Sequence, residues 1–123
     1  MRDRILLVDD DEVIRRLLAR AFRDSGFEVE EAGDGVAGLK AFSAAVHPFD
    51  LVVTDSRMPR MIGAHLAEQL RQLDSELPII HLSGSHGPAA KCMPLGVPTF
   101  YKPFSINRLL EEAKKMIQQR EQH

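Results

Sequence analysis

Residues 5–18 read ILLVDDDEVIRRLL, and this stretch decides the fold class. Four apolar residues run directly into Asp9, Asp10 and Asp11, and residues 12–25 then carry apolar side chains at helical spacing. The apolar run is typical of a strand that is buried on both faces, and the segment after it is typical of an amphipathic helix. Because three adjacent carboxylates repel one another, a cation, solvent or protonation has to offset that repulsion.

The same alternation of short apolar runs and helical patterns continues along the chain. Further strands are predicted over residues 27–32, 49–55, 79–84 and 99–102, and further helices over residues 33–45, 64–73 and 106–117. Strands that alternate with helices predict a parallel sheet with helices on both faces. The expected fold class is therefore α/β, a doubly wound five-stranded parallel sheet of the flavodoxin-like (βα)5 type.

The fourth helix of that pattern is expected to be shortened or irregular. Residues 84–96, between the fourth and fifth strands, read GSHGPAAKCMPLG. Pro88 can open a helix, but Pro94 has to end it, because proline has no amide proton and its ring clashes with the preceding turn. At most about two helical turns fit between them.

The composition is that of an ordinary globular domain, and we expect residues 1–123 to form a single domain. With 16 basic and 18 acidic residues, the net charge of -2 gives no sign of nucleic-acid or membrane binding. A single cysteine excludes an internal disulfide, and we find neither a signal peptide nor a long apolar span. These features predict a cytoplasmic protein.

Polar side chains follow four of the predicted strands. The acids at positions 9–11 end the first strand, Asp55 ends the third, Ser83 the fourth and Lys102 the fifth. Ligands bind at the carboxyl ends of the strands in such sheets, so these groups should converge on one crevice. Clustered carboxylates without nearby His or Cys favour Mg²⁺, and a carboxylate beside such an ion can act as a nucleophile towards phosphorus.

Four motifs resemble the receiver domains of bacterial two-component response regulators, the chemotaxis regulators among them. They are LLVDDDEVIRRLL, FDLVVTDSRMPRM, PIIHLSG and FYKPFSINRLL, and they occur in that order at close to the family's spacing. The resemblance covers nearly the whole chain. It implies that Asp55 is the phosphoacceptor and that Mg²⁺ is held by Asp9, Asp10, Asp55 and the backbone carbonyl of Arg57.

The resemblance also assigns roles to the later strand ends. Ser83 corresponds to the switch hydroxyl, Lys102 to the lysine that contacts the phosphoryl group, and Pro103 fixes the chain beside that lysine. Asp11 falls just outside the pocket, where we expect it to cap the first helix.

Two features depart from the family pattern, and two expectations stand outside it. Thr99 occupies the position three residues before the lysine, where relatives usually carry Tyr or Phe, so the usual coupling of hydroxyl and aromatic ring is left open. Residues 60–63 read RMIG, where relatives more often have Gly-Met-Asp-Gly. The four arginines within residues 15–23 are expected to form a solvated helix face, and His81 is expected to pack in the core.

The function implied is that of a phosphoacceptor domain in a two-component phosphorelay. A histidine kinase or a histidine phosphotransfer protein would donate the phosphoryl group, and phosphorylation would switch binding to a downstream protein. We expect no enzymatic activity beyond self-phosphorylation from small donors and autodephosphorylation. Whether the domain stands alone or belongs to a hybrid kinase, and whether it forms a homodimer, is left open by the sequence.

Two other functions compete with this interpretation. A pseudo-receiver would use the same fold only to bind proteins. A phosphatase of the haloacid-dehalogenase type would use LLVDDDEV as its D-x-D-x-V motif, with Asp9 as nucleophile and Asp11 as acid and base. The phosphatase interpretation lacks a second acidic metal motif and a cap domain, and it leaves Asp55 without a role.

Overall fold

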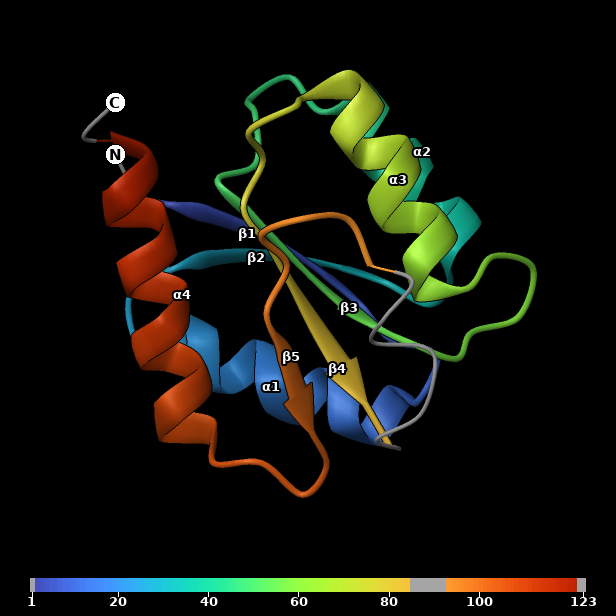
Figure 1. The fold of residues 1–123 in the computed structure, drawn as a ribbon. Helices are drawn as coiled ribbons and strands as arrows, with labels where there is room; N and C mark the ends of the chain where they lie inside the picture. Colours follow the sequence, from blue (N-terminus) through green and yellow to red (C-terminus); the bar gives the residue numbers. More distant parts are fainter. Residues whose placement is uncertain (1, 85–92, 122–123) are drawn as a thin grey trace.

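The computed structural model describes residues 2–84 and 93–121 of the chain. The strands are β1 (Arg4–Val8), β2 (Glu28–Ala32), β3 (Leu51–Asp55), β4 (Ile79–Ser83) and β5 (Thr99–Tyr101). They form one parallel sheet in the order β2-β1-β3-β4-β5 (Figure 1). The predicted fold class is confirmed.

Helices of the described residues cover both faces of the sheet (Figure 1). The helices are α1 (Glu12–Asp24), α2 (Gly35–Ala44), α3 (Gly63–Leu73) and α4 (Ile106–Glu121). Ile5 and Leu7 of β1 belong to the core cluster under α1 and α4, while Leu6 and Val8 belong to the cluster under α2 and α3. Since the central strands are buried on both faces, they read as continuous apolar runs in the sequence.

The strand order places the site of ligand binding. The chain leaves β1 for β2 on one side and later returns to β3 on the other side, so the strand order reverses between β1 and β3. In doubly wound sheets the ligand crevice lies at this point, outside the carboxyl ends of the strands. Asp9 directly follows β1 and Asp55 is the last residue of β3, so both acids lie at the crevice.

The starts of α1 and α2 follow from capping side chains. Asp11 caps α1, as predicted, because its Oδ1 accepts hydrogen bonds from the amides of Val13 and Ile14 at 3.0 and 3.2 Å. Asp34 caps α2 in the same way through the amide of Ala37 at 2.8 Å. None of the four helices in the described ranges is both long enough and apolar enough to cross a membrane.

The predicted shortened helix between the fourth and fifth strands falls largely on residues 85–92, which lie outside the described residues. Residues 93–98, which follow them and lead into β5, contain a turn and no helix.

Helix α3 begins so close to the end of β3 that its first residue has to be glycine. A Cβ atom on Gly63 would lie 2.2 Å from the carbonyl oxygen of Asp55 and 3.2 Å from the Cα of Ser56. Both neighbours are backbone atoms, which cannot rotate away as a side chain would. This close approach fixes the start of α3 against the backbone of Asp55.

We expect Gly63→Ala to lower the free energy of unfolding by about 2 kcal/mol or more, because the added methyl group forces the backbone of β3 or α3 to shift. Urea denaturation followed by circular dichroism measures the change. Gly84→Ala is the matched control, since its added Cβ would meet no atom of the described residues within 4 Å. Equal stabilities for the two variants would contradict the packing argument.

Candidate functional site

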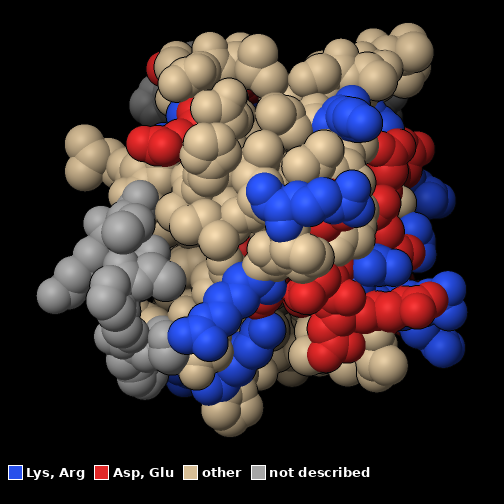
Figure 2. Space-filling model, turned by 90° about the vertical axis from the view of Figure 1, so that its right-hand side faces the viewer, with Lys and Arg blue, Asp and Glu red and all other residues tan. Residues whose placement is uncertain are grey.

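Three carboxylates meet at the carboxyl ends of β1 and β3. One oxygen from each of Asp9, Asp10 and Asp55 lies within 4.8 Å of the other two. Asp9 and Asp55 are buried, while Asp10 is exposed. Figure 2 views this end of the sheet and shows acidic side chains running down one part of the face, with basic side chains on either side.

The Asp9 side chain has one satisfied oxygen and one unsatisfied oxygen. Its Oδ1 accepts a hydrogen bond from the amide of Asp11 at 2.9 Å, whereas its buried Oδ2 has no partner among the described residues. Burial raises the pKa of Asp9 to about 6; the Asp11 hydrogen bond opposes this, the charge of Asp55 adds to it, and Lys102 and Asp10 have smaller opposite effects. A cation bound at Oδ2 would therefore stabilise the charged form of this carboxyl.

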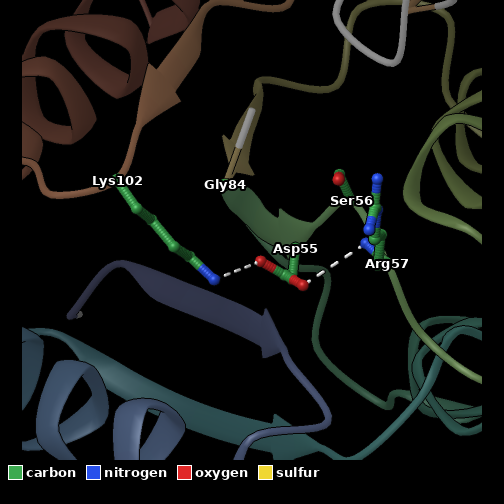
Figure 3. Close-up of a pocket in the computed structure, with 5 residues that line it drawn as sticks. All are labelled: Asp55, Ser56, Arg57, Gly84 and Lys102. Carbon is green, nitrogen blue, oxygen red and sulfur yellow. Dashed lines mark hydrogen bonds and ion pairs between the residues drawn. The ribbon is translucent and has the colours of Figure 1, made fainter. Parts of the chain in front are cut away.

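Asp55 is held between an ammonium group and a backbone amide (Figure 3). Lys102 Nζ lies 2.7 Å from Asp55 Oδ1, and the amide of Arg57 donates to Oδ2 at 3.3 Å. Burial lowers the pKa of Lys102, but the hydrogen bond and charge of Asp55 outweigh burial and raise the pKa above its usual value. The lysine is therefore a fixed positive charge beside Asp55.

An open pocket of about 200 Å³ adjoins this ion pair. It is lined by Asp55, Ser56, Arg57, Gly84 and Lys102 (Figure 3). Lys102 reaches it because its own amide donates to the carbonyl of Ser83 at 2.8 Å, which pairs the end of β5 with the end of β4. An anionic group that entered this pocket would meet a carboxylate and two basic residues.

The structure gathers most of the predicted site residues at one place. Asp9, Asp10, Asp55 and Lys102 come together as expected, and Arg57 lines the pocket. Ser83 is buried directly before Gly84, which supplies the pocket wall on that side. Pro103 follows the lysine through a cis peptide bond. Three carboxylates, one of which has an unsatisfied buried oxygen, fit a hard divalent cation.

Comparison with known proteins places this site in a family. The family model of the response regulator receiver domain matches residues 5–114. The chain belongs to the response regulator receiver family. The resemblance predicted from the four motifs is thereby confirmed, as is a role in two-component signalling.

Receiver proteins of known sequence match almost all of this receiver domain. The response regulator receiver protein CpdR of Brucella abortus is 32% identical over 117 residues, which cover 93% of this chain and 96% of CpdR. The response regulator MprA of Mycobacterium bovis is 35% identical over 120 residues, covering 95% of this chain and 51% of MprA. This chain thus spans nearly all of CpdR but only about half the length of MprA.

Solved receiver structures share the fold. The receiver domain of the hybrid histidine kinase CckA is 33% identical with a TM-score of 0.77, and the match covers 93% of this chain and 98% of that one. The response regulator TrrA of Thermotoga maritima, solved in complex with Mg²⁺-BeF, is 30% identical with a TM-score of 0.81 and the same coverage of the two chains.

One prediction about the arginines of α1 is wrong. Arg15 does not belong to the solvated face of this helix: only 16% of its side chain is exposed, and its guanidinium contacts the backbone of Asp9 and the side chain of Glu31. Sequence reasoning missed this residue because all four arginines fit the same helical pattern. Arg15 is distinguished in space, by its contact with the backbone of Asp9 at the end of β1 together with its contact with Glu31 of β2.

The structure also gives partners to Thr99 and to the RMIG segment. Thr99 Oγ1 lies 3.1 Å from Nδ1 of His81, which is fully buried as predicted. Arg60 adopts a left-handed φ of 70° and pairs with Asp34 Oδ2 at 2.6 Å. Position 99, where an aromatic residue is the more usual one, thus carries a threonine that forms a polar contact with the neighbouring strand β4. Arg60 links the loop after β3 to the start of α2.

In metal-free protein we expect Asp9 to lower stability as the pH rises. Its folded pKa of about 6 exceeds the ordinary value of 3.8, so between these values the folded state binds more protons than the unfolded state. The free energy of unfolding then falls with increasing pH through this range. At pH 7.5 in EDTA, Asp9→Asn should be more stable than wild type by an amount on the order of 2 kcal/mol.

Urea denaturation in EDTA at pH 4 and pH 7.5 measures this difference, which should shrink towards the lower pH. Asp24→Asn, an exposed acid on α1, is the control and should show no such pH dependence. If wild type is at least as stable as Asp9→Asn at pH 7.5, the buried carboxylate of Asp9 does not destabilise the folded protein and the prediction is wrong.

Proposed function

We propose that this receiver domain, comprising residues 1–123 as one unit, accepts a phosphoryl group on Asp55. The observation that carries the proposal is the position of this carboxylate. It ends β3, lines an open pocket, lies 2.7 Å from the Lys102 ammonium and shares its surroundings with the acids Asp9 and Asp10. The donor would be a phosphohistidine of a histidine kinase or of a histidine phosphotransfer protein.

The transfer is a displacement at phosphorus. A carboxylate oxygen of Asp55 forms the new O–P bond while the P–N bond to the donor imidazole breaks, and the imidazole leaves with the electron pair and takes up a proton. The ammonium of Lys102, 2.7 Å from Asp55 Oδ1, offsets negative charge beside the attacking carboxylate. After transfer, Lys102 loses its carboxylate partner and is close enough to pair with a phosphoryl oxygen instead.

Asp9, Asp10, Asp55 and the backbone carbonyl of Arg57 would hold Mg²⁺. The unsatisfied Oδ2 of Asp9 and the gathering of three carboxylates support this assignment, as does the Mg²⁺-BeF complex of TrrA. When bound, the ion would supply positive charge to offset the negative charge of the transferring phosphoryl group. The protein's own contribution is to hold the acids at one place before binding occurs.

Ser83 and Pro103 support the same site. Ser83 ends β4 next to the pocket residue Gly84, and we assign its hydroxyl to binding a phosphoryl oxygen. The carbonyl of Ser83 accepts a hydrogen bond from the amide of Lys102, so a movement of the Ser83 backbone would also move Lys102. Pro103 restricts the backbone directly after that lysine.

The readout we propose is a change in binding to a downstream protein, without catalytic turnover and within the cytoplasm. Release of phosphate by the domain would be confined to slow loss from its own Asp55. Thr99 Oγ1 lies 3.1 Å from His81 Nδ1, so any movement of β5 would have to break this contact or move His81 with it.

Phosphorylation is tested by intact mass after incubation with phosphoramidate and Mg²⁺. We expect wild type to gain one phosphoryl group, Asp55→Asn to gain none, and the gain in wild type to vanish in EDTA. Lys102→Met should accumulate the modification more slowly because the ammonium group then no longer offsets negative charge at Asp55. Asp24→Asn, on the exposed face of α1, should behave as wild type.

The other functions predict different results in the same experiment. A pseudo-receiver would show no added mass although Mg²⁺ binds. A phosphatase would release inorganic phosphate over many turnovers, unaffected by Asp55→Asn and abolished by Asp9→Asn. Either result would contradict the proposed function.

A further inference from the structure

The guanidinium of Arg15 joins the acidic end of β1 to the edge strand β2. Its Nη1 donates to the carbonyl oxygen of Asp9 at 2.9 Å, and its Nε pairs with Oε1 of Glu31 at 3.2 Å. Both side chains are largely covered, with 16% of Arg15 and 23% of Glu31 exposed. Neither residue lines the phosphoacceptor pocket.

The carbonyl that Arg15 contacts belongs to the peptide bond between Asp9 and Asp10. The orientation of this peptide plane determines how both carboxylates leave the backbone. On its other side Asp9 is held by β2, because its amide donates to the carbonyl of Ala32 at 3.1 Å. The backbone of Asp9 is therefore held at its amide by Ala32 and at its carbonyl by Arg15. Together these two hydrogen bonds fix the direction in which Asp9 and Asp10 leave the end of β1.

Glu31 holds the guanidinium in this orientation. It also faces Arg23, whose Nη2 lies 3.4 Å from Glu31 Oε2 and donates to the carbonyl of Val29 at 3.0 Å. Because Glu31 pairs with Arg15, the charge of the guanidinium is offset beside a site that has to attract a cation.

We propose that Arg15, oriented by Glu31, is a positioning residue for the acidic pair and thereby sets the affinity of the site for a divalent cation. It acts through the backbone of Asp9 and contacts neither the metal nor the phosphoryl group. This inference rests on the proposed function, in which Asp9 and Asp10 hold Mg²⁺. Groups that orient metal ligands from outside the ligand set commonly contribute strongly to metal affinity.

The geometry requires arginine in particular. Two different nitrogens of one planar guanidinium reach the Asp9 carbonyl and the Glu31 carboxylate at the same time. Lysine carries a single nitrogen on a flexible stem, so it cannot hold both partners in this fixed arrangement. Arg15→Lys retains the charge and removes the fork, which separates a positioning effect from an electrostatic effect.

The test is a titration of melting temperature with Mg²⁺, which yields an apparent Kd because the ion stabilises the folded state that binds it. We expect Arg15→Gln and Arg15→Lys to weaken Mg²⁺ binding by about tenfold or more. Glu31→Gln should weaken it in the same direction and by less. Arg16→Gln is the matched control, since the Arg16 side chain is 71% exposed and pairs with Glu12 on the helix surface.

The second readout is the rate of phosphorylation by phosphoramidate. At low Mg²⁺ the Arg15 variants should be slow, and at saturating Mg²⁺ they should recover to within about twofold of wild type, because only binding of the ion is impaired. A purely structural role would lower the melting temperature in EDTA and leave the Mg²⁺ affinity unchanged. That result, or a rate that stays low at saturating Mg²⁺, would overturn the inference.

The outcomes separate this inference from the proposed function. If Arg15→Gln fails to fold, Glu31→Gln and Arg15→Lys carry the same test. If wild type binds Mg²⁺ and is phosphorylated while the variants match it in affinity, only the role of Arg15 is wrong. If wild type neither binds Mg²⁺ nor accepts a phosphoryl group, the proposed function fails and this inference fails with it.

Discussion

Repulsion among three carboxylates is the constraint on which the rest of this site depends. Two like charges about 4 Å apart repel by about 4 kcal/mol at an effective dielectric near 20, and here Asp9, Asp10 and Asp55 place oxygens within 4.8 Å of one another. Lys102 offsets part of this cost through its contact with Asp55. Burial, with a smaller contribution from the charge of Asp55, raises the pKa of Asp9, so a bound cation would favour the charged form of this carboxyl.

The fold tolerates this repulsion because the acids are fixed by strongly packed elements. β1 and β3 are apolar strands that are buried on both faces of the sheet. Gly63 lets α3 start directly against the backbone of Asp55. A looser end of the sheet would let the carboxylates separate and lower their repulsion. Core packing and site chemistry are thus linked through backbone position: stability generated in the sheet maintains an arrangement of charges that is unfavourable on its own.

Much of this could be predicted from sequence, for a physical reason. Strands buried on both faces appear as apolar runs, and the acids that end them mark the carboxyl edge of a parallel sheet, so Asp9 and Asp55 could be placed together without coordinates. Arg15 could not be distinguished from other arginines on α1, since its burial depends on β2, a neighbour in space. The contact of Thr99 with His81 likewise depends on the register of β4 and β5, which no local pattern encodes.

The most direct test of the central claim is to locate the modified residue chemically. An acyl phosphate on aspartate is reduced by borohydride to homoserine, which peptide mass spectrometry identifies at a single position. After phosphorylation in the presence of Mg²⁺, we expect homoserine at position 55 and aspartate at positions 9 and 10. Homoserine at position 9, or at no position in a protein that binds Mg²⁺, would contradict it.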